Sequence, residues 1–327
     1  MEVQYKILIA LGILALLWVV AFILWGLTLL ISFICYYKTF YSSLDRTKKN
    51  DAVLKKTEFI FQMYGEQLVK WRHEVEALEY KDVFIESFDK IKLHAKYYEI
   101  NKGAPIEIFF HGYRGSANRD MNAAIKRAID HGRNALAVDH RGGGESMGTS
   151  ISFGVNESRD CVQWVNYAVE NIDKNAKIIL CGVSMGAATV LMASGMGLPK
   201  NVVGIVADCG YTSAKEMIID TMRGMHLPAK LLYPFSKFGA KLYGHFDLEE
   251  ITPLQLVPKS TTPTIFFHGD SDEFVPCEMS KRNYDACGAT KKKLVTIKGA
   301  GHATAYLTDP ETYSRELFAF IDSVLAD

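Results

Sequence analysis

The chain has 327 residues, a formal net charge of zero and 49% hydrophobic residues. This length suits one large domain with an appendage, and the neutral charge balance gives no indication of a nucleic-acid partner. The six cysteines form no C-x-x-C pair, and no cluster of His and Cys has the spacing of zinc ligands, so we expect no metal site. Several cysteines lie in apolar runs, where cysteine behaves as a small buried hydrophobe, and this favours a reducing compartment.

A long uncharged segment lies near the beginning of the chain. From Ile7 to Tyr37 there is no Asp, Glu, Lys, Arg, His, Asn or Gln. This segment exceeds the roughly 20 residues that a helix needs to cross a bilayer, and a cleaved signal peptide has a much shorter apolar core. We therefore predict a single-pass membrane anchor over residues 1–38, formed by one transmembrane helix that is tilted or over-long.

The basic residues around this segment predict its orientation. Lys6 precedes the segment, whereas a group of basic residues follows it: Lys38, Arg46, Lys48, Lys49, Lys55 and Lys56. In membrane proteins the cytoplasmic flank carries the excess of Lys and Arg. We therefore expect the lipid bilayer as a partner and the rest of the chain on the cytoplasmic side.

Residues 39–81 are predicted to link this anchor to the main domain. The first part is polar and basic, which is typical of a juxtamembrane connector. From Asp51 to Tyr80, apolar residues recur three, four or seven apart with charges between them, and this spacing predicts an amphipathic helix. The helix packs on the following domain or, alternatively, lies on the membrane surface or beside the mouth of a site.

After Tyr80, short apolar runs alternate with helical patterns. The runs Val83–Phe88 and Lys92–Ile100 flank a turn and predict an antiparallel pair of strands. Further strands are expected at 106–110, 135–138, 177–181, 202–207, 264–267 and 293–297, with helices at 117–131, 159–172 and 312–325. Short apolar strands separated by helices predict an α/β domain over residues 82–327, with a mostly parallel sheet flanked by helices.

One interval interrupts this alternation. More than fifty residues, rich in Met, Leu, Phe and Tyr, separate the strand ending at Ala207 from the strand starting at Thr264. A structureless loop of that length is uncommon in a compact domain. We therefore expect a small helical cap at about 211–259, above the carboxyl edge of the sheet.

The segment Gly182-Val183-Ser184-Met185-Gly186 carries the strongest chemical signal. It follows the apolar run 178–181 and precedes a helical pattern. A strand, Gly-x-Ser-x-Gly and a helix, in this order, are the context of a nucleophile elbow, where a tight turn projects the serine hydroxyl from the sheet. The pattern alone also occurs by chance in a chain of this length, so the surrounding motifs are needed to interpret Ser184 as a nucleophile.

Two later loops supply candidates for the groups that activate a serine. The hydroxyl needs a base to take its proton, and the base needs an orienting acid. One predicted strand ends in the acidic loop His268–Pro276, and the last strand ends in the loop Gly299–Ala303 with His302. Both loops follow the carboxyl ends of strands, where α/β enzymes carry their chemistry, and the order Ser, Asp, His fits this architecture.

Together these motifs resemble the α/β-hydrolase family, in the branch with serine aminopeptidase-like, monoglyceride-lipase-like and acyl esterase members. The elbow, the acid loop and the base loop are joined by His111–Gly115, similar to the H-G-x-x-G oxyanion loop, and by the D-x-R-G-x-G-x-S segment at 139–146. The resemblance covers about residues 82–327. It implies the α/β-hydrolase fold with a helical cap.

The resemblance also implies a catalytic triad. Ser184 would be the nucleophile, His302 the general base and Asp272 the orienting acid. Asp270 in the same loop and Asp208 at the end of an earlier strand remain rivals for the acid.

Other residues of these loops receive structural or backbone roles from the resemblance. The oxyanion hole would use the backbone N–H groups of Tyr113 and Met185, and the Tyr113 phenol would line the acyl pocket. His111 and His268 are expected to hold loops by hydrogen bonds. Arg141 and its following glycines do not match a phosphate-binding pattern, so we expect a turn braced by an internal Arg pair and no nucleotide, metal or organic cofactor.

These expectations favour a membrane-anchored serine hydrolase that cleaves an ester or thioester of an apolar, lipid-like acyl chain. One alternative is a serine aminopeptidase-like peptidase or amidase, whose substrate amine would need a carboxylate near the mouth of the site: Glu216, Asp220, Glu249 or Glu250. Another is a non-catalytic, membrane-tethered scaffold. No pattern in the chain specifies an oligomeric state.

Overall fold

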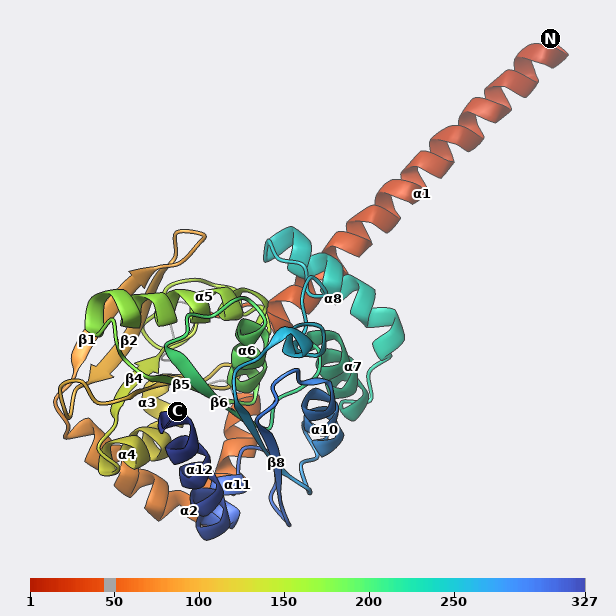
Figure 1. Ribbon diagram of the computed structural model, residues 1–327. Helices are drawn as coiled ribbons and strands as arrows, with labels where there is room; N and C mark the ends of the chain where they lie inside the picture. The colour runs from red at the N-terminus through yellow and green to blue at the C-terminus, as the bar shows by residue number, and fades with distance from the viewer. Residues whose placement is uncertain (44–50, 327) are drawn as a thin grey trace.

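An eight-stranded sheet forms the centre of the molecule (Figure 1). The computed structural model describes residues 1–43 and 51–326, with the side chains of 51–62 outside that description. The strands follow the order β1-β2-β4-β3-β5-β6-β7-β8, and β2 runs antiparallel to both neighbours while the others are parallel. Their bounds are β1 Lys81–Glu86, β2 Lys92–Tyr98, β3 Ile106–Phe110, β4 Asn134–Val138, β5 Ile178–Val183, β6 Val202–Asp208, β7 Thr264–Gly269 and β8 Lys292–Ile297. The predicted antiparallel opening and parallel remainder are confirmed.

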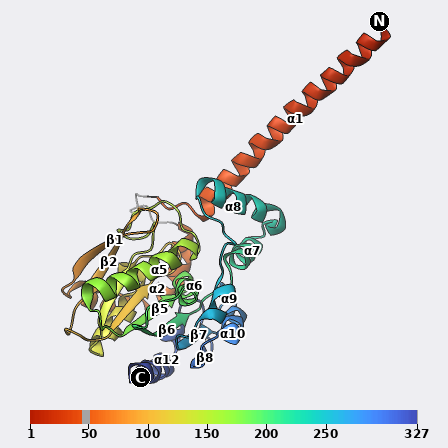
Figure 2. The ribbon, with the colours of Figure 1, turned by 45° about the horizontal axis from the view of Figure 1, so that its top comes forward.

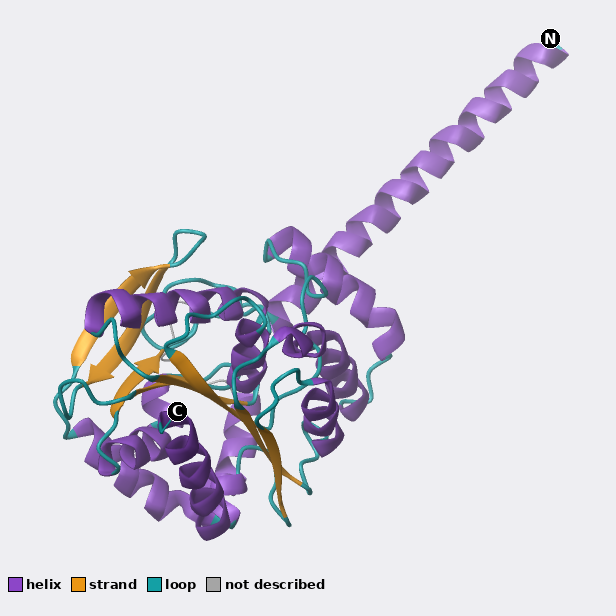
Figure 3. Cartoon of the chain, in the orientation of Figure 1, coloured by secondary structure: helices purple, strands orange, loops and turns teal. Residues whose placement is uncertain are grey.

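The central strands are apolar on both faces because helices cover both. In β5, Ile178 and Leu180 join one buried cluster while Ile179 and Cys181 join another, as the alternation of side chains along a strand requires. α4 (Asn122–Asp130) and α12 (Pro310–Leu325) pack on one face. The other face carries α5 (Val155–Tyr167), α6 (Met185–Ser194) and α10 (Cys277–Ala286). Figure 3 shows these helices around the strands.

Two predicted helices differ in detail from the observed ones. The pattern at 117–131 is divided into α3 (Ala117–Asp120) and α4 because Met121 leaves the helical conformation, with ψ near 3°. The pattern at 159–172 begins earlier, at Val155, and continues beyond α5 as a wider π-helical turn, η1 (Ala168–Ile172). Short turns of helix complete the domain: α9 (Pro253–Leu256), η2 (Val257–Lys259) and α11 (Ala305–Thr308).

A helical subdomain occupies the interval between β6 and β7. It consists mainly of α7 (Ala214–Gly224) and α8 (Ala229–Tyr243). α7 begins where the Ser213 hydroxyl accepts a hydrogen bond from the Glu216 backbone N–H at 3.2 Å, which satisfies one of the free donors of a helix N-terminus. We call α7, α8 and their connecting turn the cap.

The first helix, α1 (Glu2–Thr39), extends away from the body of the molecule. Every residue up to Leu27 is exposed, and among the described helices α1 is the one long and apolar enough to cross a membrane. The last third of α1 packs against α8 of the cap, and the two helices cross there (Figure 2). The two helices approach closely because Gly239 has no side chain: a Cβ there would lie 2.3 Å from the Ser32 carbonyl oxygen.

The second helix, α2 (Asp51–Glu76), lies within the interval where the sequence predicts an amphipathic helix, and it packs against α4. Val75 is buried in the same cluster as the side chains of α4, and the Trp71 ring stacks on Tyr306 with 5.6 Å between ring centroids. Of the expected positions of this helix, the structure therefore shows the one in which it packs on the domain.

Candidate active site

Ser184 lies at the turn between β5 and α6 with a positive φ of 56°. This strained conformation is held by its surroundings, since the Ser184 N–H donates to the Asp208 carbonyl oxygen at 2.8 Å. The flanking glycines are required by close contacts. A Cβ at Gly182 would lie 2.2 Å from the Gly186 carbonyl oxygen, and a Cβ at Gly186 would lie 2.0 Å from that of Phe110. The turn therefore has the tightness that Gly-x-Ser-x-Gly predicts.

Three side chains from three different loops form one line of hydrogen bonds. His302, in the loop after β8, lies with Nε2 2.9 Å from the Ser184 Oγ. Its Nδ1 lies 2.8 Å from Oδ2 of Asp272, in the loop after β7. The structure thus brings together the three residues that the sequence analysis selected for a triad.

The Asp272 carboxylate is held by its own loop. Its Oδ1 accepts hydrogen bonds from the backbone N–H groups of Phe274 and Val275, both at 2.9 Å. Burial opposes ionisation of this carboxyl, but the hydrogen bonds from His268 and His302 outweigh burial and hold its pKa well below the usual range. Asp272 is therefore ionised and oriented toward His302.

His268 also contacts the Asp272 carboxylate. Its Nε2 lies 3.1 Å from the Asp272 Oδ2 and 2.8 Å from the Val275 carbonyl oxygen, and its Nδ1 lies 2.6 Å from the Ser280 hydroxyl. Because both ring nitrogens are engaged within the acid loop, His268 has the loop-holding position expected of it.

The two rival carboxylates have other partners. Asp270 is exposed and accepts hydrogen bonds from the Gly299 N–H at 2.7 Å and from the Ser271 hydroxyl at 3.0 Å. Asp208 is buried and accepts from the Tyr313 hydroxyl at 3.0 Å. Burial raises the pKa of Asp208 to about 6, although the Tyr313 hydrogen bond opposes this shift. Neither carboxylate is among the described hydrogen-bond partners of His302.

Two backbone segments adjoin the Ser184 hydroxyl. Met185 is the first residue of α6, and the first N–H groups of a helix have no acceptor within the helix. Gly112, just before Tyr113, approaches so closely that a Cβ on it would lie 3.6 Å from the Ser184 Cβ. The backbone around Met185 and Tyr113 therefore lies beside the serine, where an oxyanion hole needs its donors.

The loop that contains Tyr113 also binds the end of α1, a contact that the sequence analysis missed. The Tyr113 hydroxyl donates to the Thr39 carbonyl oxygen at 2.5 Å, and the Arg114 guanidinium donates to the Lys38 carbonyl oxygen at 2.9 Å. The last carbonyls of a helix lack partners within it, so both side chains cap α1. More than 70 positions of sequence separate the partners, and no local pattern signals such a contact.

His111 holds this loop against the next one. Its Nδ1 lies 2.7 Å from the Gly112 carbonyl oxygen, and its Nε2 accepts the His140 backbone N–H at 3.0 Å. Because Nε2 accepts, Nδ1 carries the proton and donates. The loop-holding position expected for His111 is confirmed.

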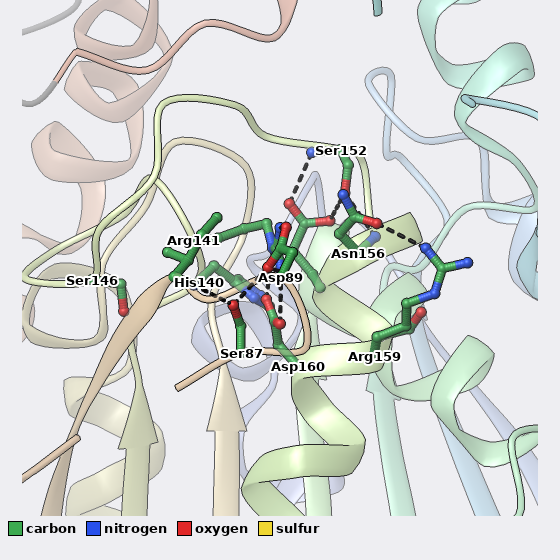
Figure 4. Close-up of polar contacts among 12 residues, drawn as sticks. Ser87, Asp89, His140, Arg141, Ser146, Ser152, Asn156, Arg159 and Asp160 are labelled. Atoms are coloured by element: carbon green, nitrogen blue, oxygen red, sulfur yellow. Dashed lines mark hydrogen bonds and ion pairs between the residues drawn. The ribbon is translucent and has the colours of Figure 1, made fainter. Parts of the chain in front are cut away.

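Arg141 is the centre of a buried ion-pair network (Figure 4). Its guanidinium binds both oxygens of Asp160 at 2.7 Å and both oxygens of Asp89 at 2.8 and 3.1 Å. This double pairing joins the β1–β2 turn to α5 and uses the planar fork of the guanidinium on both sides. The prediction of a turn braced by an internal Arg pair is confirmed.

The four carboxylates proposed for binding a substrate amine each have a cationic partner. Glu216 pairs with Arg282 at 3.0 Å, Asp220 with Arg223 at 3.0 Å and Glu249 with Lys237 at 3.4 Å. Glu250 pairs with Arg159. These pairs neutralise the negative charge that would attract an amine to these four positions.

One group among the described residues has the spacing of metal ligands: Cys209, Asp272 and His302. Both ring nitrogens of His302 are already engaged by Ser184 and Asp272. Burial raises the pKa of the Cys209 thiol well above its usual value, which disfavours the thiolate that binds metals. The donor set therefore fits a proton relay better than a metal centre.

Comparison with known proteins agrees with this architecture. Residues 108–233 match the family model described as the alpha/beta hydrolase fold. The chain is 29% identical over 197 residues to the uncharacterized protein YqkD of Bacillus subtilis, covering 60% of this chain and 64% of that protein. The match thus spans less than two thirds of the length of YqkD.

Two further matches carry names that mention an activity. The chain is 23% identical over 266 residues to the bifunctional esterase/perhydrolase DCH of Acinetobacter calcoaceticus, covering 68% of this chain and 93% of that protein. The solved structure of the Pyrococcus furiosus esterase Pf2001 superposes with a TM-score of 0.63 at 23% identity, covering 76% and 93% of the two chains. With its strand order, its helices on both faces and its strand–Ser184–helix turn, this chain has the α/β-hydrolase fold.

Proposed function

We propose that the chain is a membrane-anchored serine hydrolase that cleaves a carboxylic ester or thioester through an acyl-enzyme. The observation that carries the proposal is the continuous hydrogen-bonded line from Asp272 through His302 to the Ser184 hydroxyl. A hydroxyl, an imidazole and an ionised carboxylate in this order form the arrangement that activates a serine nucleophile.

Acylation begins at Ser184. Its Oγ attacks the substrate carbonyl carbon while its proton passes to Nε2 of His302. Asp272 keeps the other ring proton on Nδ1 and stabilises the imidazolium that forms. When the bond to the alcohol or thiol breaks, His302 returns the proton to that leaving group, and the acyl group remains on Ser184.

Deacylation repeats these steps with water. His302 takes a proton from the water, whose oxygen attacks the acyl carbon, and the bond to Ser184 Oγ breaks as the serine regains its proton. The products are a carboxylic acid and an alcohol or thiol. In both steps the backbone N–H groups of Tyr113 and Met185 would hold the negative oxygen, and each such donor is worth about 2.7–4 kcal/mol of barrier.

An apolar acyl group suits the surroundings of Ser184. Met185, Phe153 and Tyr211 belong to one buried cluster that extends into the cap, and the Tyr113 ring packs 5.0 Å from that of Phe153. The relative named esterase/perhydrolase supports an ester, and the paired cap carboxylates remove the support that an aminopeptidase would need.

The contacts of α1 support a helix that stays attached to the mature protein. Tyr36 and Phe40 are buried with the cap, and the Thr39 carbonyl accepts from Tyr113 beside the candidate oxyanion hole. Removing α1 as a signal sequence would expose this cluster. The excess of basic residues after the helix favours a cytoplasmic domain, which protease protection in sealed right-side-out vesicles tests: digestion from outside would refute it.

Labelling and turnover test the chemistry. The wild type is expected to react with a fluorophosphonate probe and to hydrolyse a short-chain ester, whereas Ser184→Ala loses both. Ser271→Ala is the matched control, because that exposed hydroxyl contacts only Asp270 among its described side-chain partners. Full esterase activity in Ser184→Ala would overturn the proposal. Thioesters and aminoacyl amides in the same screen distinguish the acyl substrate.

A further inference from the structure

The length of α1 that is free of the body of the protein matches the thickness of a bilayer. The apolar segment starts at Ile7, and every residue from there to Leu27 is exposed, whereas Ser32, Tyr36 and Phe40 are buried against the domain. At 1.5 Å per residue, the exposed apolar part is about 31 Å long, close to the roughly 30 Å hydrocarbon core. The bilayer boundary thus falls near Trp25–Leu29, where α1 meets the cap.

α8 crosses α1 at this level (Figures 1 and 2). Contacts along the crossing run in order: Phe238 packs on Trp25, Gly239 approaches Ser32, and Tyr243 packs on Phe33. The side of α8 that carries Phe238 therefore faces the free, apolar part of α1. The buried side of α8 faces the end of α1 that enters the domain.

The side facing the free part of α1 is an apolar stripe. It consists of Leu231, Phe235, Phe238 and Leu242, which are spaced four, three and four residues apart and so lie within one narrow arc of the helix. Leu231 is 63% exposed and Leu242 is 41% exposed, on either side of the crossing. The preceding turn adds two more exposed apolar side chains, Met225 and Leu227.

Positive charge borders this stripe. Lys230 and Lys241 are exposed and eleven residues apart, which places them on the same side of α8, next to the stripe. An apolar stripe beside lysines is the pattern of a helix that lies in a lipid interface and meets anionic headgroups. Trp25, at the same level on α1, is a residue type enriched at membrane interfaces.

We infer that α8 is a second membrane contact, lying in the surface of an anionic bilayer with the apolar stripe inserted below the headgroups. The inference rests on the proposed membrane anchoring by α1. The partner of the cap is thus the lipid surface, and the substrates are acyl compounds carried by that bilayer. Two contacts with the membrane, α1 and α8, fix the orientation of the domain, which one flexible tether would leave free to turn.

Depth measurements on the full chain in nanodiscs of phosphatidylcholine and phosphatidylglycerol test this inference. In a Cys35→Ala/Cys277→Ser background, an environment-sensitive fluorophore is attached at Leu231→Cys or Leu242→Cys. Glu278→Cys, an exposed position on α10, is the control. At 231 and 242 we expect blue-shifted emission that acyl-chain spin labels quench, and at 278 neither effect, because interfacial helices bury their apolar face about 5–10 Å deep.

Two accompanying readouts separate this inference from the proposed function. Retention on the nanodisc after an alkaline wash reports the anchor, and hydrolysis of a water-soluble ester reports the chemistry. If both persist while the labels at 231 and 242 respond like the label at 278, membrane contact by α8 is overturned and the proposed function stands. Loss of retention overturns the anchor and the cap contact together.

A variant extends the test to the substrate. Leu231→Ser/Leu242→Ser removes two exposed side chains, so it leaves the fold and the hydrolysis of a soluble ester unchanged. We expect a clear loss in hydrolysis of a long-chain ester embedded in the nanodisc. Equal losses on both esters, or on neither, would contradict delivery of the substrate from the bilayer.

Discussion

Replacing Tyr113 by Phe separates the side chain from the backbone donor of the same residue. The variant keeps the N–H proposed for the oxyanion hole but removes the hydroxyl that donates to the Thr39 carbonyl at 2.5 Å. Burial raises the pKa of Tyr113 to about 12, so the wild-type hydroxyl is a donor throughout the physiological range. The substitution therefore tests whether the end of α1 positions the oxyanion loop.

The structure bounds the expected effect. A buried carbonyl left without its partner costs about 1–3 kcal/mol of stability, and since Thr39 is only half-buried this range is an upper bound. Each kcal/mol lowers the Tm of a domain of this size by about 2–4 °C. Complete loss of one oxyanion donor lowers kcat by about 10²–10³. Because the N–H remains and only its placement loosens, we expect kcat to fall by about five- to tenfold, equivalent to about 1–1.4 kcal/mol, with little change in KM.

Tyr243→Phe is the matched control. It removes a hydroxyl that donates to the Leu29 carbonyl at 3.2 Å on the same helix but away from the oxyanion loop. Kinetics with a short-chain ester and thermal unfolding of the whole 327-residue chain in nanodiscs measure both effects. We expect Tyr243→Phe to lose some stability and keep kcat. Equal kcat values in the two variants would refute a role of α1 in positioning the loop.

Three further predictions concern the triad, the elbow and pH. Asp272→Asn lowers kcat by about 10⁴-fold because it no longer orients His302, whereas Asp270→Asn keeps both the Gly299 contact and the activity; equal rates would contradict the choice of acid. Gly186→Ala costs about 3 kcal/mol or more, since its Cβ would lie 2.0 Å from the Phe110 oxygen, and Gly224→Ala, which meets nothing within 4 Å, leaves the Tm unchanged. Burial raises the pKa of Asp208 to about 6, so the folded state keeps a proton that the unfolded chain releases near pH 4. Ionisation of Asp208 therefore reduces the stability of the fold as pH rises from about 4 to about 6. Asp208→Asn therefore gains stability relative to the wild type across that window, by up to about 3 kcal/mol, and a Tm difference that does not change from pH 4.5 to 7.5 would argue against the shift.

Patterns within single elements predicted most of the architecture. The strands could be predicted because each is a short apolar run between turn residues. The turn around Ser184 could be predicted because close backbone contacts at positions 182 and 186 exclude any side chain. Asp272 and His302 could be chosen because parallel strands bring their carboxyl-end loops to one edge of the sheet. Their catalytic roles stay predictions that the variants above test.

Contacts between elements far apart in the chain could not be predicted from local sequence patterns. The composition of the uncharged segment 7–37 predicts a membrane helix. Composition does not distinguish a residue that faces lipid from one that faces a protein core, and Ser32 and Tyr36 face the protein core. The break at Met121 is similar, because the helical spacing continues on both sides of it. The pairing of Tyr113 with Thr39 depends on how α1 enters the domain, which only the tertiary structure specifies.

The burial of Tyr36 and Phe40 has a consequence for biogenesis. Their partners Tyr243, the last residue of α8, and Phe246, which follows it, are synthesised about 200 residues later than these two side chains. If α1 is the membrane anchor proposed above, its insertion precedes completion of the core to which it contributes. A helix inserted a turn too deep would withdraw Phe40 from Phe246 by about 5 Å. With the proposed anchor, the maturation of the domain would thus report on the depth at which α1 was inserted.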